Sequence, residues 1–185
     1  MKPFMKKSLF LVLFLGLMFY KVSEVNAQVT PTITPLPQEL VEYNLPYPGL
    51  LPDNSLYFIK SFRDQLLLWT TRSEVKKANL YLLLADKNLV MGKTLWEKGN
   101  EDLSIRTFEK GERYLLTGVI TLQTIKNRED LPPGLRDKFE LSGKKHGIVL
   151  NSVKDLIKDE RWVQSMETTL NLLHQAMQLN LKLKP

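Results

Sequence analysis

The distribution of prolines most strongly limits what this chain can fold into. The chain has 10 prolines. Six of them lie within residues 28–52, and only Pro132, Pro133 and Pro185 follow residue 52. Because proline fixes φ and lacks a backbone N–H, a helix cannot persist through residues 28–52. Beyond residue 52, apolar residues recur at helical spacing without strand-like alternation. The sequence therefore predicts an all-α domain over residues 53–185, preceded by a Pro-rich linker and extended strap over residues 28–52.

The first 27 residues have the pattern of a secretory signal peptide. Lys2, Lys6 and Lys7 precede an apolar run over residues 9–20, and a polar stretch then ends at Ala27. We expect cleavage after Ala27, an extracytoplasmic location and no stable membrane insertion of the processed chain. The alternative is an uncleaved anchor formed by residues 9–20, although a membrane-spanning helix needs about 20 apolar residues.

Charge and cysteine content exclude several classes of function. The formal net charge of +6 includes four Lys and one Glu within residues 1–27, so the processed chain carries only +3. An exported chain of such modest charge is not expected to bind nucleic acid. The absence of Cys excludes disulfides, metal–thiolate sites and a cysteine lipid anchor. Stability must therefore come from helix packing.

Apolar periodicity and capping residues predict a bundle of about five helices. The first helix is predicted over residues 54–70, where apolar residues recur at helical spacing at Phe58, Phe62, Leu66 and Trp69. Asp53 or Asn54 is expected to cap this helix. The others are expected over residues 72–98, 101–126, 131–158 and 160–180. Gly99 and Asn100 suit the end of one helix and the start of the next.

The second and third predicted helices should form a tight antiparallel hairpin. Folding the chain about Gly99 and Asn100 pairs residues whose numbers sum to 200, so that each large side chain faces a small one. Close approach of this kind explains why glycine is used inside helices, where it costs about 1 kcal/mol relative to alanine. The predicted contacts are Ala78, Leu82, Ala85, Leu89 and Gly92 on one helix and Phe108, Gly111, Leu115, Gly118 and Leu122 on the other.

No motif in the sequence specifies a reaction. His146 lies on an apolar helical stripe, and neither it nor His174 has a carboxylate or a second histidine three or four residues away. We interpret His146 as a hydrogen-bonded histidine at the edge of the core, and whether the two histidines meet in space stays open. We assign no catalytic, cofactor-binding or metal-binding residue and no cofactor. The lysine-rich helix faces are interpreted as solvated mixed-charge surfaces, with weak attraction to anionic surfaces as the alternative.

One stretch resembles a known family. Residues 47–64 read YPGLLPDNSLYFIKSFRD and are followed by LLLW at 66–69, KKANL at 76–80 and LADK at 84–87. This resembles a bacterial family of exported helical proteins defined only as domain of unknown function 5667, from residue 47 to about residue 116. The resemblance implies helices after a signal segment and a Pro-rich lead-in, and it implies no activity. Within the motif we expect Leu56, Tyr57 and Ile59 to pack.

We therefore expect an exported, non-enzymatic helical protein that binds or scaffolds another protein of the cell envelope. One alternative is a weakly basic protein that associates with the envelope or membrane surface. A further alternative is a small-ligand binder or enzyme with a site between helices. The partner, the biological process and the oligomeric state do not follow from the sequence.

Overall fold

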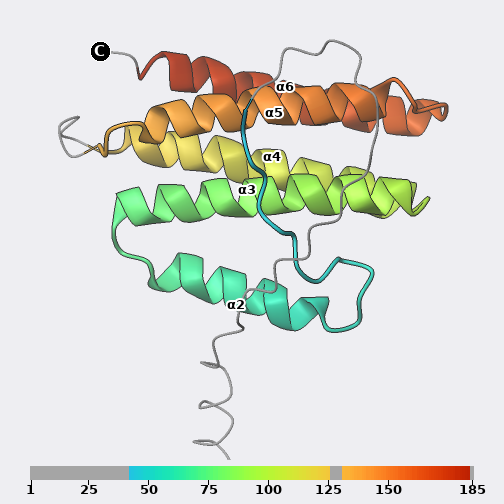
Figure 1. Ribbon diagram of the computed structural model, residues 1–185, viewed down its shortest axis with the longest axis horizontal. Helices are drawn as coiled ribbons and strands as arrows, with labels where there is room; N and C mark the ends of the chain where they lie inside the picture. Colours follow the sequence, from blue (N-terminus) through green and yellow to red (C-terminus); the bar gives the residue numbers. More distant parts are fainter. Residues whose placement is uncertain (1–41, 126–130, 184–185) are drawn as a thin grey trace, which may run out of the picture. The chain divides into compact units, whose positions relative to one another are not determined.

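The fold is all-α, as predicted. The structure is a computed structural model, and it describes residues 42–125 and 131–183, which contain no strand. Five helices follow one another along the chain (Figure 1). They are α2 (Tyr57–Thr70), α3 (Glu74–Glu97), α4 (Glu101–Gln123), α5 (Leu135–Lys154) and α6 (Glu160–Leu181). The predicted signal peptide and the first part of the linker lie outside the described residues.

Four of the helices form a closed bundle, and α2 lies outside it. Helix α3 packs on α4, α4 on α6, α6 on α5 and α5 on α3, whereas the backbone of α2 approaches only α3. Figure 1 shows α2 as a separate helix set apart from this group, next to α3. In the part of the chain that the structure describes, no helix is long and apolar enough to cross a membrane.

The α3–α4 hairpin is the most extensive helix pairing in the bundle. Its turn follows the predicted chemistry, because Gly99 has φ +78° and the Asn100 side chain accepts a hydrogen bond from the Leu103 N–H. The start of helix α3 is capped in the same manner, since the Ser73 side chain accepts a hydrogen bond from the Lys76 N–H. These caps fix where both helices start.

The ten residues of the predicted hairpin contact are all buried. An added Cβ on Gly92 would lie 2.5 Å from the ring of Phe108, and one on Gly111 would lie 3.5 Å from the Leu89 backbone nitrogen. An added Cβ on Gly118 would lie 2.8 Å from the ring of Phe139 on α5 and 3.2 Å from the Tyr81 Cβ on α3, so this glycine makes room both for the hairpin and for a helix outside it. Small residues in the hairpin thus serve two packing partners.

Two predicted helix starts are wrong. Residues 52–56 form turns, and α2 begins at Tyr57 after Leu56, which provides no side-chain cap. Asn54 accepts from the Leu56 N–H and Asp53 pairs with Lys98, so both polar side chains serve the turn rather than the helix. Pro132 and Pro133 likewise precede α5 instead of forming its first turn, because Gly134 at φ +77° redirects the chain before Leu135.

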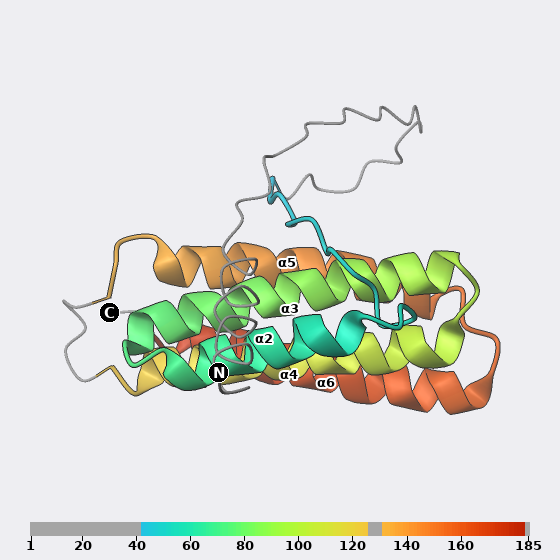
Figure 2. The ribbon, with the colours of Figure 1, turned by 90° about the horizontal axis from the view of Figure 1, so that it is seen from below.

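The predicted strap is present. Residues 42–48 run without a helix, strand or turn, and in Figures 1 and 2 the segment crosses α3 on its way to α2. Leu45 packs against the core, and the Lys60 ammonium on α2 donates to the carbonyl oxygens of Pro48 and Leu50 at 2.6 and 3.1 Å. The strap and α2 are thereby held to each other as well as to the bundle.

Candidate functional site

A buried network of polar side chains crosses the centre of the bundle. His146 on α5 is fully buried, and its ring lies between Glu112 on α4 and Asp86 on α3. The distance from Nδ1 to Glu112 Oε1 is 2.6 Å, and that from Nε2 to Asp86 Oδ1 is 3.1 Å. Ser142 donates to Asp86 Oδ1, and the Tyr43 hydroxyl donates to Asp86 Oδ2, both at 2.6 Å. The network joins three bundle helices and the strap.

The electrostatics of this network favour a protonated histidine. Burial alone would lower the pKa of His146, but the charges and hydrogen bonds of Glu112 and Asp86 outweigh burial and raise this pKa to about 9. A protonated ring donates from both nitrogens, as two flanking carboxylates require. Burial, together with the hydrogen bond to Asp86, also raises the pKa of Tyr43 above its ordinary value. At neutral pH, an imidazolium therefore offsets the carboxylate charge inside the core.

The sequence interpretation found the histidine but not its partners. Asp86 and Glu112 are 60 and 34 residues away from His146 along the chain, so no local spacing signals them. His146 is fully enclosed rather than at the edge of the core, whereas His174 on α6 is exposed. The two histidines therefore do not meet. Across the described ranges, no group of three or more His, Asp or Glu side chains could hold a metal ion.

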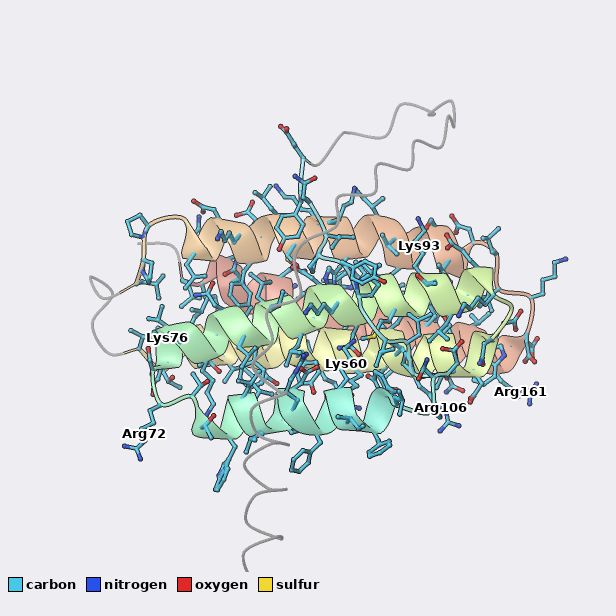
Figure 3. All side chains as sticks on the ribbon, turned by 60° about the horizontal axis from the view of Figure 1, so that its bottom comes forward. Lys60, Arg72, Lys76, Lys93, Arg106 and Arg161 are labelled. Atoms are coloured by element: carbon cyan, nitrogen blue, oxygen red, sulfur yellow. The ribbon has the colours of Figure 1, made fainter. Side chains whose placement is uncertain are left out.

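Helix α2 presents its apolar side to solvent. Phe58, Phe62 and Trp69 are 68, 69 and 82% exposed, and they recur at helical spacing along the outer side. Figure 3 shows aromatic side chains projecting from α2 away from α3 and α4. The expectation that Leu56 and Ile59 pack is also wrong, since both are exposed, whereas Tyr57 is half-buried. An open hollow of about 520 Å³ lies beside Phe58 and Phe62.

Polar residues share the bundle-facing side of α2 with one buried apolar side chain, Leu68. Asp64 is buried there beside the half-buried Lys60, whose Nζ lies 3.1 Å from the Met91 sulfur. Burial lowers the pKa of Lys60 to about 8, against the attraction of Asp64. Lys110 on α4 lies over the Tyr57 and Tyr114 rings, at 5.6 and 5.9 Å from their centres. The amphipathic pattern of α2 is thus inverted relative to a helix that packs by its apolar face.

A comparison with protein families gives this arrangement a context. The model of the family described as Domain of unknown function (DUF5667) matches residues 49–160. The chain belongs to this family. No curated protein and no solved structure matches it. The DUF5667 match runs past residue 116, where the sequence resemblance fades, and it includes α2 to α5 together with Asp86, Glu112 and His146.

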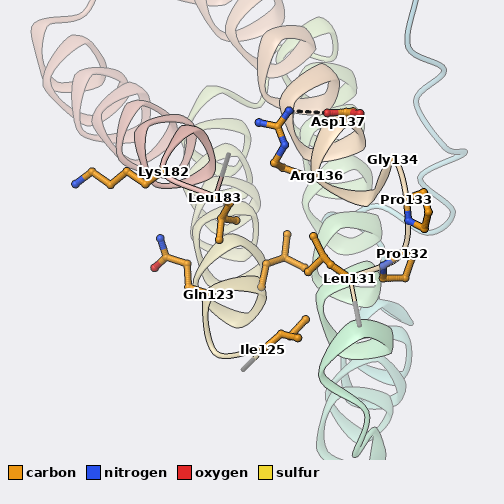
Figure 4. A pocket seen from close by; sticks show the side chains of 11 residues that line it. Gln123, Ile125, Leu131, Pro132, Pro133, Gly134, Arg136, Asp137, Lys182 and Leu183 are labelled. Carbon is orange, nitrogen blue, oxygen red and sulfur yellow. Dashed lines mark hydrogen bonds and ion pairs between the residues drawn. The ribbon is translucent and has the colours of Figure 1, made fainter. Parts of the chain in front are cut away.

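Helix α6 lies beyond the DUF5667 match apart from its first residue, yet it completes the bundle. At its far end, a hollow of about 650 Å³ lies between the ends of α4 and α6 and the start of α5 (Figure 4). Arg136 and Lys182 line it, and Arg136 is paired with Asp137 at 2.8 Å. Ile125 and Leu131, which end and begin the two described ranges, also line this hollow, and we assign no ligand to it.

Proposed function

We propose that this protein is an exported, non-enzymatic docking module that binds a component of the cell envelope through the outer face of α2. The observation that carries the proposal is the exposure of Phe58, Phe62 and Trp69 on one side of a helix whose polar side faces the bundle. Aromatic side chains bury about 150–250 Å² each when they are covered, so these three leave roughly 450 Å² of apolar surface in water. Patches of this size on a monomer are commonly functional.

The buried network supports a structural role rather than catalysis. Both ring nitrogens of His146 are occupied by carboxylates, and the ring has no exposed surface. A general base must reach a proton on its substrate, either directly or through one water molecule. An enclosed imidazole with both nitrogens engaged does not meet this requirement.

Export is part of the same proposal and rests on the sequence of residues 1–27. We propose that the signal is removed after Ala27 and that residues 28–41 link the new amino terminus to the strap. Amino-terminal sequencing of the exported protein tests this step. The processed chain should begin at Gln28, and a chain retaining residues 9–20 would instead support the uncleaved anchor.

Docking is tested with a chain comprising residues 28–185, which retains the compact unit Glu39–Pro185 with its own core. The purified chain should sediment with the envelope fraction of the cells that produce it. The triple variant Phe58→Ser/Phe62→Ser/Trp69→Ser should bind at least about tenfold more weakly, because exposed aromatic anchors dominate such contacts.

The matched control removes exposed apolar side chains elsewhere. Tyr47, Leu156 and Leu181 are 84, 62 and 48% exposed and do not belong to α2. The control triple to serine should sediment like the unmodified chain, and circular dichroism should show that both variants keep the helical fold. Equal sedimentation of the α2 variant and the unmodified chain would contradict docking through α2.

A further inference from the structure

We propose that the surface bound by the outer face of α2 is an anionic lipid bilayer. This inference rests on the proposed docking role and assigns the chemical class of the partner. It combines the arrangement of the aromatic face, the surrounding charge and the sequence that precedes α2.

The exposed aromatic side chains of α2 form a row along one side of the helix, so all of them can contact one planar surface. Helix α2 has 14 residues and is about 21 Å long. Phe58, Phe62 and Trp69 lie along one side of it. Figure 3 shows the helix at the boundary of the molecule with its aromatic side chains pointing outward. Helices that lie in a membrane interface place Phe, Trp and Leu into the boundary between headgroups and acyl chains in the same manner.

Charge favours a bilayer over a second copy of this chain as the occupant. A second copy would bring the same excess of basic residues, with Arg72, Lys76 and Lys77 at the end of its own α2. Anionic headgroups carry the opposite charge, and a bilayer also supplies an apolar phase that receives each ring separately.

The charge around α2 favours anionic over neutral lipid. Lys60 faces the bundle, but residues 61–77 hold four further Lys and Arg residues against two Asp and Glu residues. Arg63 pairs with Asp64, while Arg72, Lys76 and Lys77 follow at the end of α2 that carries Trp69. Figure 3 shows Arg72 and Lys76 where α2 leads into α3. Basic residues beside an inserted aromatic face strengthen binding to anionic headgroups and make that binding sensitive to salt.

The sequence before α2 points to the same compartment. Residues 9–20 form the apolar run that we expect to direct the chain to a membrane, and the Pro-rich segment 28–52 leads from it to α2. Retention of the signal would hold α2 beside the membrane, and cleavage would release the chain into the compartment that this membrane borders.

The test uses the chain of residues 28–185 and lipid vesicles without protein, made of phosphatidylcholine with or without phosphatidylglycerol. The chain should sediment with the anionic vesicles and be released by salt. The α2 triple variant to serine should lose at least about tenfold in vesicle affinity, and the control triple Tyr47→Ser/Leu156→Ser/Leu181→Ser should not. Replacing Arg72, Lys76 and Lys77 by glutamine should weaken binding, whereas the same change at Lys138, Lys144 and Lys145 on α5 should have little effect.

A spectroscopic signature separates insertion from mere adsorption. The emission of Trp69, which is 82% exposed, should shift to shorter wavelength on anionic vesicles. The Trp69→Phe variant should still bind but lose this shift. Emission that stays unchanged on binding would overturn insertion of the α2 face.

The outcomes distinguish this inference from the docking role on which it rests. Binding to envelope fractions but not to lipid vesicles would overturn the bilayer and leave docking through α2 intact, with a protein as the partner. Equal binding to both kinds of vesicle would overturn the preference for anionic lipid. A dimer that the α2 triple variant dissociates, without vesicle binding, would identify a second copy and overturn the bilayer. Envelope binding that the α2 variant retains would overturn both proposals.

Discussion

At the scale of single residues, His146 connects the stability of the bundle to pH. The pKa of His146 is about 9 in the folded chain against 6.5 for an unperturbed histidine. Because the folded-state pKa is raised, the stabilisation is fully present below pH 6.5 and is lost as pH rises through about 9. The difference in pKa corresponds to about 3 kcal/mol in the free energy of unfolding.

The prediction is a pH profile of urea unfolding compared between the unmodified chain and His146→Gln. The free-energy difference between them should shrink from below pH 6.5 to above pH 9. Lys60 acts in the opposite sense, since its pKa is lowered to about 8 and its deprotonation favours the folded state above that pH. This contribution is common to both chains and cancels in the comparison. A difference that stays constant across this range would contradict a protonated His146.

Tyr43 provides a second prediction at this scale. Tyr43→Phe removes the hydroxyl that donates to Asp86 and leaves a buried carboxylate oxygen without this donor. We expect a loss of about 1–3 kcal/mol in the free energy of unfolding, as is typical of hydrogen bonds to charged groups. The matched control is Tyr47→Phe on the same strap, which is 84% exposed and should change stability by less than about 0.5 kcal/mol. Urea unfolding measures both, and equal losses would show that Tyr43 does not anchor the strap through its hydroxyl.

The limit of sequence reasoning at residue scale is visible in this network. Capping by Asn100 could be predicted because the side chain acts on a backbone N–H three residues away. The pairing of His146 with Asp86 and Glu112 could not, because it requires the relative rotation of three helices. A single histidine on an apolar stripe indicates only that some partner is needed.

At the scale of elements, a glycine inside a helix has different consequences in different helices. A Cβ on Gly92 would lie 2.5 Å from the ring of Phe108, which is fully buried and cannot move aside. Gly92→Ala should therefore destabilise the chain by about 1–3 kcal/mol despite the better helix propensity of alanine. A Cβ on Gly147 would meet nothing closer than 3.7 Å, so Gly147→Ala should be neutral or stabilise by up to about 1 kcal/mol.

A double variant separates overpacking from other effects of the substitution. Gly92→Ala/Phe108→Leu should lose less stability than the sum of the two single variants, because a smaller side chain releases the space that the new methyl group needs. Additive losses in urea unfolding would place the cost of Gly92→Ala elsewhere than at Phe108.

The orientation of α2 shows what periodicity alone cannot decide. The spacing of Phe58, Phe62 and Trp69 correctly predicts a helix, but it does not say which side faces the bundle. The structure turns that side outward. Lys60 instead donates to the strap and lies beside Met91 on α3, and the buried Asp64 pairs with Arg63 on α2 itself. The same helix also has a polar side, and this side indicates that the helix could face the bundle the other way round. Its residues recur at the same spacing and are Tyr57, Lys60, Ser61 and Asp64.

At the scale of the whole molecule, the DUF5667 match ends where the last helix of the bundle begins. The match ends at residue 160, while α6 contributes Met166, Leu170, Leu173 and Ala176 to the common core and packs on both α4 and α5. Without α6, the apolar sides of these two helices would face water. The bundle therefore depends on a helix that the family match hardly includes.

The corresponding prediction is that a chain ending at Asp159 does not fold cooperatively. Met166, Leu170 and Leu173 of α6 each contribute about 1.5–3 kcal/mol by leaving water, and their removal also exposes the apolar surface that they cover on α4 and α5. The total loss is therefore comparable to the 5–15 kcal/mol by which a domain is usually stable. Thermal unfolding followed by circular dichroism should lose its sigmoidal transition. A chain beginning at Glu39, which spans the compact unit, should keep a transition close to that of the chain beginning at Gln28. A cooperative transition in the chain ending at Asp159 would mean that α3, α4 and α5 form a core of their own.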